Sequence, residues 1–166
     1  MLDNTKVFDV VTPMSYFHNV SRKIKNVEEF DIKRGMWCKQ VAGGVMSFNE
    51  STTAATSGVN VLCLSDAKKP GTGASMYETN DVKVGSVTAI NTPGVRVTVG
   101  EDFLVAPAAW DYSVYNAGVS LGVEETAGAD AGKLKAVTTG DWANAMIEDV
   151  DNVNKTVTYF IAATQL

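Results

Sequence analysis

One short segment of the chain matches the pattern of a hydrolase nucleophile. Residues 118–122, Gly-Val-Ser-Leu-Gly, fit G-x-S-x-G, in which a serine sits at a sharp turn between a strand and a helix. That chemistry needs a helix after the serine and, in this fold class, a histidine downstream. Residues 123–132 are acidic and rich in glycine and alanine, and the only histidine, His18, lies upstream. We therefore expect Ser120 to be an outward-facing strand residue, opposite an inward row of Val119, Leu121 and Val123.

Two further segments match ligand-binding loops only in part. Residues 68–75, Lys-Lys-Pro-Gly-Thr-Gly-Ala-Ser, lack the Gly-Lys-Ser/Thr of a phosphate-binding loop and predict a surface turn. Residues 148–156 gather acidic and asparagine side chains, as calcium loops do. Counted from Asp149, however, the sixth and twelfth positions of an EF-hand would be Asn154 and Phe160 instead of Gly and Glu. The pattern instead predicts a hairpin turn rich in Asp and Asn.

The remaining reactive and aromatic side chains are few. With two cysteines and one histidine, a single chain cannot supply four Cys and His ligands to zinc, so we interpret Cys38 and Cys63 as buried apolar thiols. The acidic pairs at 101–102 and 124–125 are interpreted as solvated charge in loops. Of the tryptophans, Trp37 is expected in the core, whereas two flank loops where they could contact a partner: Trp110 and Trp142.

Composition narrows the functional classes. The chain has 166 residues, of which 45% are hydrophobic and 20% charged, which predicts one globular domain with an appended arm. The net charge is −5 and no basic run occurs, so we expect no direct nucleic-acid binding. No apolar stretch approaches the roughly 20 residues that cross a bilayer, and the N-terminus does not resemble a signal peptide. We expect neither a membrane association nor a cofactor.

Glycine divides the chain into two regions. All 14 glycines lie from Gly35 onward, so we predict an N-terminal arm at 1–34 and a body at 35–166. Residues 15–30 carry apolar side chains at helical spacing, but an extended arm packing on a neighbour fits equally well. The preceding residues 6–13 predict a strand that ends at a proline.

The body predicts short β-strands. Residues 35–48 indicate a hairpin around Gly43-Gly44, residues 58–66 a compact apolar strand, and residues 81–106 an alternating apolar pattern broken by turns. Further short strands follow at intervals of about ten residues. Together they predict an all-β fold: a small barrel or sandwich body with an N-terminal extension.

The C-terminal half resembles the capsid decoration (cement, or head auxiliary) proteins of tailed bacteriophages. Four pieces match that pattern: Tyr115–Leu121, Gly132-Lys133-Leu134, Trp142–Val150 and Val157–Ile161. Residues 32–44 resemble the family's opening strand and turn, and residues 82–99 its middle hairpin, so the likeness covers about 32–163. The arm and the linker at 47–58 depart from the family pattern.

The resemblance implies a small β-barrel or β-tulip protein on the outer surface of an icosahedral head. Such a protein binds the major capsid protein between capsomers, is often an oligomer with a trimer favoured, and needs no catalytic residue, metal or cofactor. We therefore expect a virion structural protein at the capsid surface, assembled in the host cytoplasm.

The arm is too apolar to remain without a partner surface, and strand addition to a neighbouring copy is one way to cover it. The expected partner-binding residues are Val7, Phe8, Tyr16, Phe17 and Trp110. Two alternatives stay open, namely another phage head or tail component and a carbohydrate-binding β-sandwich that uses Trp110 or Trp142. An enzyme of the cupin or dUTPase kind is disfavoured, because a cupin usually supplies several histidines.

Overall fold

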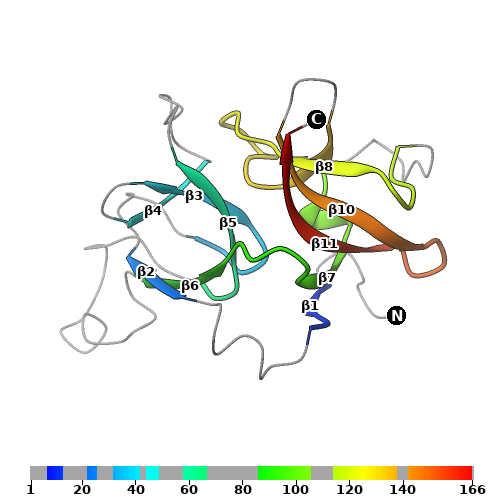
Figure 1. Ribbon diagram of the computed structural model, residues 1–166, viewed down its shortest axis with the longest axis horizontal. Helices are drawn as coiled ribbons and strands as arrows, with labels where there is room; N and C mark the ends of the chain where they lie inside the picture. The colour runs from blue at the N-terminus through cyan, green and yellow to red at the C-terminus, as the bar shows by residue number, and fades with distance from the viewer. Residues whose placement is uncertain are drawn as a thin grey trace. The chain divides into compact units, whose positions relative to one another are not determined.

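The computed structural model describes residues 7–12, 22–25, 32–41, 44–48, 58–66, 86–105, 114–137 and 142–165. The fold is all-β, as predicted, with one curled sheet that forms half a barrel and a second sheet (Figure 1). The described residues fall into two compact units. The six-stranded unit includes residues 92–105 and 114–124, and the five-stranded unit includes residues 32–41 and 125–132.

The six-stranded unit is built on an antiparallel sheet with the order β1-β7-β11-β10-β8-β9. Its strands are β1 (Phe8–Val10), β7 (Arg96–Gly100), β8 (Ser120–Val123), β9 (Leu134–Ala136), β10 (Trp142–Asp151) and β11 (Thr156–Gln165). A short 3-10 helix, η2 (Glu101–Phe103), follows β7. The hairpin of β10 and β11 is the longest pairing, and its register shifts twice along β10, which indicates β-bulges.

Period-two alternation explains why these segments form strands with one buried face. Along β7, Arg96 is exposed and Thr98 half-buried, whereas the valines beside them are fully buried. The strands β10 and β11 alternate in the same way. The buried row consists of Val97, Val99, Ala143, Ala145, Ile147, Val157, Tyr159 and Ile161. The sheet therefore has one apolar face and one mixed, partly exposed face.

The five-stranded unit has an antiparallel sheet with the order β2-β6-β5-β3-β4. Its strands are β2 (Arg22–Lys25), β3 (Trp37–Val41), β4 (Gly44–Ser47), β5 (Val59–Cys63) and β6 (Ser86–Ile90). The edge strands β2 and β4 lie near each other, so the sheet curls back on itself (Figure 1). The pairing of β3 with β4 confirms the predicted hairpin, and β5 confirms the predicted apolar strand.

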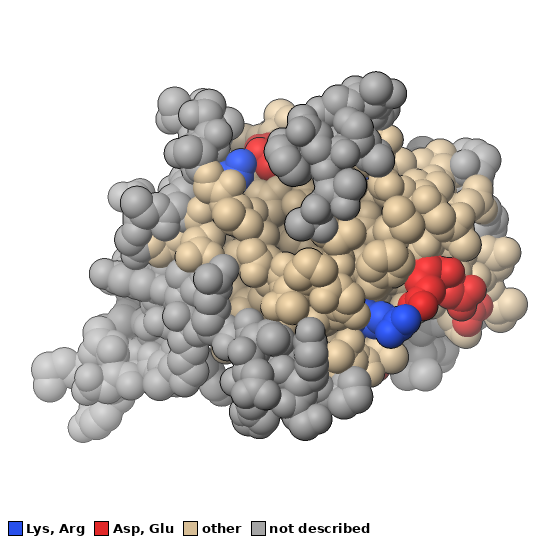
Figure 2. Space-filling view, in the orientation of Figure 1, with Lys and Arg blue, Asp and Glu red and all other residues tan. Residues whose placement is uncertain are grey.

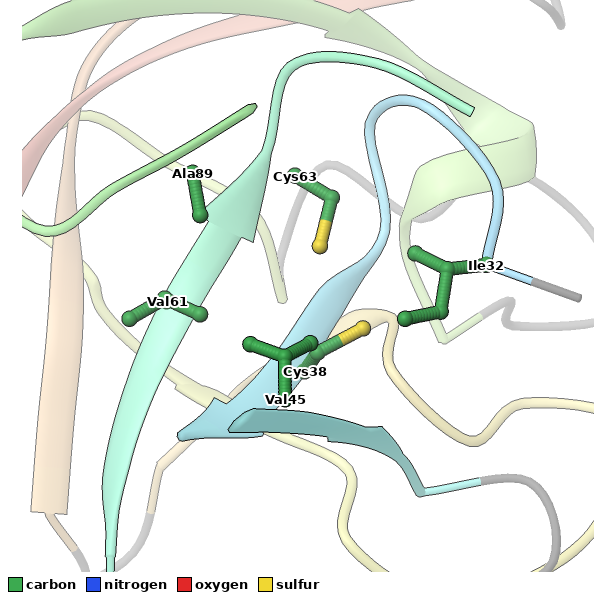
Figure 3. Packing of buried hydrophobic residues seen from close by; sticks show 6 residues of the cluster. All are labelled: Ile32, Cys38, Val45, Val61, Cys63 and Ala89. Carbon is green, nitrogen blue, oxygen red and sulfur yellow. The ribbon is translucent and has the colours of Figure 1, made fainter. Parts of the chain in front are cut away.

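One face of this sheet carries a compact core that includes both cysteines. Side chains converge on it from β3, β4 and β5 (Figure 3), and its members are Ile32, Cys38, Val45, Val61, Cys63 and Ala89. Both cysteines are free thiols and buried, which confirms the prediction for them. On the opposite face the register joins Trp37 to Leu62 and Leu62 to Ile90, all of them buried. The tryptophan is therefore a core residue, as expected.

Two strands come from the segment predicted to be an arm. β1 pairs with β7, placing Phe8 opposite Val99, and so confirms a strand within residues 6–13. Residues 22–25 form β2, which pairs with β6, so this part is extended instead of helical. The boundary between an arm at 1–34 and a body at 35–166 stays a prediction.

Candidate functional site

The predicted partner-binding residues that the structure describes lie on β1, at one edge of the six-stranded sheet. The Gly100 amide donates to the carbonyl of Val7 (2.9 Å), and the Val11 amide donates to the carbonyl of Arg96 (3.0 Å). The Phe8 ring lies 5.8 Å from the Phe103 ring, measured between centroids. Thus one side of the strand is occupied within the unit, and no described strand pairs with the other side.

This edge also presents an apolar side chain of the arm that was not among the five predicted partner-binding residues. Val11 is 52% exposed, whereas Val7 and Phe8 are half-buried. An edge strand with an unpaired backbone can accept a further strand. The other three predicted contacts, Tyr16, Phe17 and Trp110, lie outside the described residues, and whether any of the five touches a partner stays a prediction.

The turn between β10 and β11 forms a second protruding feature. The amides of Val153 and Asn154 donate to Asp151 Oδ1 (2.9 and 3.0 Å), and Asn154 Nδ2 donates to Asp151 Oδ2 (2.7 Å). Hydrogen bonds from Asn154 lower the pKa of Asp151, and the bond from the backbone amide of Asn154 has the largest effect. The hairpin turn predicted here is therefore confirmed. At its tip Val153 is 90% exposed.

One ion pair lies on the mixed face of the six-stranded sheet. Arg96 Nε and Nη2 donate to the two oxygens of Glu148 (2.6 and 3.0 Å). This two-point hydrogen bond raises the pKa of Arg96 and lowers that of Glu148. In Figure 2, blue and red atoms lie next to one another where they appear on the described surface. The Arg96–Glu148 pair therefore offers charged atoms of both signs for polar contacts.

A polar cluster in the five-stranded unit overturns one interpretation of the sequence. Glu125 was expected to be solvated loop charge, but it accepts hydrogen bonds from Lys39 Nζ and Asn60 Nδ2, both at 3.0 Å. Its neighbour Glu124 bonds Lys135 Nζ at 3.0 Å. Lys39 lies 86 residues from Glu125 in the sequence. No local sequence pattern therefore indicates this pair, which is seen only in the folded structure.

The described residues do not form the catalytic arrangement that the G-x-S-x-G match would require. Ser120 begins β8, its carbonyl accepts the amide of Val137 (3.1 Å), and the chain continues into the β8–β9 hairpin instead of a helix. Leu121 and Val123 are buried, as expected, while Val119 is only half-buried. Ser120 is therefore a strand residue, and the elbow interpretation is excluded.

The described part of the chain contains no three His, Cys, Asp or Glu side chains close enough together to hold a metal ion. Nor do those residues include a helix with the length and apolar character needed to span a membrane. Comparisons of the chain with known protein families, curated proteins and solved structures found no match.

Proposed function

We propose that this protein is a virion structural protein, a decoration protein that binds the outer surface of a phage head and stabilises contacts between major capsid subunits. One observation carries the proposal. The four sequence pieces that resemble decoration proteins lie in or beside β8, β9, β10 and β11, which are consecutive neighbours in one sheet. The four pieces of the C-terminal half, which match separately along the chain, thus lie in or beside the strands of one sheet.

The edge strand β1 is the proposed main contact with a neighbouring subunit. Its outer side has no described strand partner, and Val11 at its end is exposed to solvent. A partner strand added here would gain backbone hydrogen bonds and cover apolar side chains of the arm. Its own pairing with β7 holds the strand extended before binding, which reduces the entropy lost on association.

The β10–β11 hairpin tip is the proposed second contact. Three hydrogen bonds to Asp151 fix the turn, so Val153 projects from a rigid support instead of a mobile loop. A single exposed valine contributes little by itself. Copies of a protein on a symmetric shell repeat each modest contact many times, and that repetition holds the lattice.

The test is sedimentation of purified protein with heads that lack it, followed by cryo-electron microscopy of the loaded heads. We expect the protein to pellet with heads and to appear at a symmetric position on the outer surface. Absence of the protein from purified virions, or failure to bind such heads, would contradict the proposal.

A matched pair of substitutions locates the contact. Val11→Arg places a long charged side chain at the β1 edge, and we expect it to weaken head binding at least tenfold. Val59→Arg is the control, because Val59 is 55% exposed, close to the 52% of Val11, but lies in the five-stranded unit. Equal weakening by both variants would show that β1 is not the contact.

A further inference from the structure

Lys39 and Asn60 lie directly opposite each other in the five-stranded sheet. They are register partners on β3 and β5, which are neighbouring antiparallel strands. Opposite residues of an antiparallel pair project from the same face, with their Cβ atoms about 4.5–5.5 Å apart. The register therefore places an amine and a carboxamide side by side.

A single carboxylate joins the two nitrogen atoms. Lys39 Nζ donates to Glu125 Oε2 at 3.0 Å, and Asn60 Nδ2 donates to Glu125 Oε1 at 3.0 Å. A carboxylate only accepts hydrogen bonds, so the amide of Asn60 must present its nitrogen to it. Glu125 thus contacts both nitrogen atoms, which is the position required to carry a proton from one to the other.

Solvent has little access to the side chain of Lys39. Lys39 is 9% exposed, and its Nζ lies 5.6 Å from the centroid of the Phe48 ring, itself a buried residue. Asn60 Oδ1 is shielded from solvent, whereas the side chain of Glu125 is 39% exposed. Transfer of the proton from Lys39 to Glu125 would leave two neutral groups. That transfer also frees the lone pair that makes an amine a nucleophile.

Glycine at position 58 leaves room for the stem of Lys39. A Cβ there would stand 2.8 Å from Lys39 Cγ and 2.5 Å from the carbonyl oxygen of Gln40, so no other residue fits without movement. The backbone at Gly58 has φ +145°, a conformation that favours glycine. The stem of Lys39 therefore packs against the residue that directly precedes β5, the strand that carries Asn60.

We propose that Lys39 and Asn60 form an intramolecular isopeptide bond, with Glu125 as the catalytic acid and base. The proton of the Lys39 ammonium passes to Glu125. The lone pair of Nζ then attacks Cγ of Asn60, a new N–C bond forms, and the carbonyl electrons move to Oδ1. This step produces a tetrahedral intermediate.

Collapse of the intermediate completes the reaction. The bond between Cγ and Nδ2 of Asn60 breaks, and its electron pair stays on the nitrogen, which takes a proton from Glu125. Nζ of Lys39 then gives its extra proton to the Glu125 carboxylate. The departing ammonia takes that last proton, which regenerates the Glu125 carboxylate. The sum is one ammonium side chain and one carboxamide converted to a secondary amide and an ammonium ion. No oxidant, reductant or cofactor takes part.

The product would be a covalent link between β3 and β5. It encloses the chain between residues 39 and 60, which includes β4, the edge strand of the sheet. Like a disulfide, such a bond stabilises the fold mainly by restricting the unfolded chain, and unlike a disulfide it resists reduction. The inference does not depend on the capsid role proposed above.

The test is mass spectrometry of the full-length protein under denaturing conditions, with the N-terminal residue identified in the same digest. We expect a mass lower than that of the sequence by one molecule of ammonia. A tryptic digest should contain a branched peptide that joins Lys39 to Asn60, with no cleavage after Lys39. The full sequence mass together with separate Lys39 and Asn60 peptides would overturn the proposal.

Three variants assign the roles. Glu125→Gln cannot shuttle the proton, and Lys39→Arg keeps a positive charge but lacks the nucleophilic amine, so both should retain the full mass. Glu124→Gln is the matched control, because it alters the adjacent carboxylate, which bonds Lys135 instead. This variant should form the cross-link as the wild-type protein does. A cross-link that persists in Glu125→Gln, or disappears equally in Glu124→Gln, would overturn the role given to Glu125.

Discussion

The two sheets of this protein hold their charged side chains in different ways. In the six-stranded unit the pair Arg96–Glu148 is open to solvent, with side chains that are 53% and 39% exposed. In the five-stranded unit the side chain of Lys39 is only 11% exposed, and its partner Glu125 is 39% exposed. Exposed pairs contribute little to stability, whereas an enclosed charge without its partner is strongly destabilising.

The longest strands of the two sheets also differ. β10 and β11 each span ten residues and bury an alternating apolar row, so this hairpin is stabilised mainly by hydrophobic packing. The strands of the other sheet have four or five residues each, and β5 buries three of its five, Val61, Leu62 and Cys63. Hydrophobic packing therefore stabilises both sheets.

The largest expected effects come from removing one core leucine in each unit. Leu121 and Leu62 are both completely buried, and replacing either with alanine should lower the free energy of unfolding by about 2–5 kcal/mol. Denaturant unfolding gives the size of the loss, and hydrogen exchange shows which sheet opens first. A loss of protection confined to the other sheet would contradict the division into two units.

Substitution of Gly58 should come next. Gly58→Ala introduces a Cβ 2.5 Å from a backbone oxygen, at a φ that alanine rarely adopts. We expect a loss of about 2–4 kcal/mol, combining backbone strain with overpacking. Gly94→Ala is the control, since Gly94 has φ +87° but no atom within 4 Å of the added Cβ. A thermal melt in which both variants lose equal stability would show that the contact with Lys39 has no effect.

Alkaline pH should destabilise the unit that contains the thiols. A hydrogen bond with Cys38, burial and the charge of Cys38 raise the pKa of Cys63 well above its usual value. The unfolded chain therefore loses its thiol proton at a lower pH than the folded one. Above the ordinary thiol pKa of about 8.5, the unfolding free energy should fall by about 1.4 kcal/mol per pH unit until the folded pKa is reached.

The measurement is denaturant unfolding at a series of alkaline pH values, with Cys63→Ala as the comparison. This variant has one titrating thiol fewer, so its stability should depend less steeply on pH over the same range. Identical slopes for the two proteins would rule out the predicted contribution of Cys63.

The smallest effect is expected at the exposed Arg96–Glu148 pair. Because hydrogen bonds from Arg96 lower the pKa of Glu148, its stabilising contribution is present at neutral pH and is lost as the pH falls through that lowered value. Glu148→Gln should change stability less than any substitution above. NMR titration of the Glu148 carboxyl should show a midpoint below the usual value for glutamate. In Arg96→Gln the midpoint should return to that usual value. The same midpoint in both proteins would contradict the pairing.

The strands could be predicted from the sequence better than the cluster of Lys39, Asn60 and Glu125 could. The reason is that strands and turns depend on residues close in sequence, whereas the cluster joins residues far apart in sequence. The hairpin at residues 35–48 and the turn at 151–154 depend on neighbouring residues, so composition and alternation indicated both. The role of Glu125 could not be predicted, because its partners lie 86 and 65 residues away in sequence. An acidic pair in a glycine-rich segment has the same local pattern whether it is solvated or buried.

The amino-acid sequence was enough to predict the fold class, the alternation of buried and exposed residues in strands such as β7, and the chemistry of the turns. These features follow from the period of two along a strand and from local backbone preferences. The pairing of β1 with β7 and the contacts among Lys39, Asn60 and Glu125 are seen only in the folded chain. Pairing between distant segments depends on side-chain packing across the whole sheet, which no local pattern encodes.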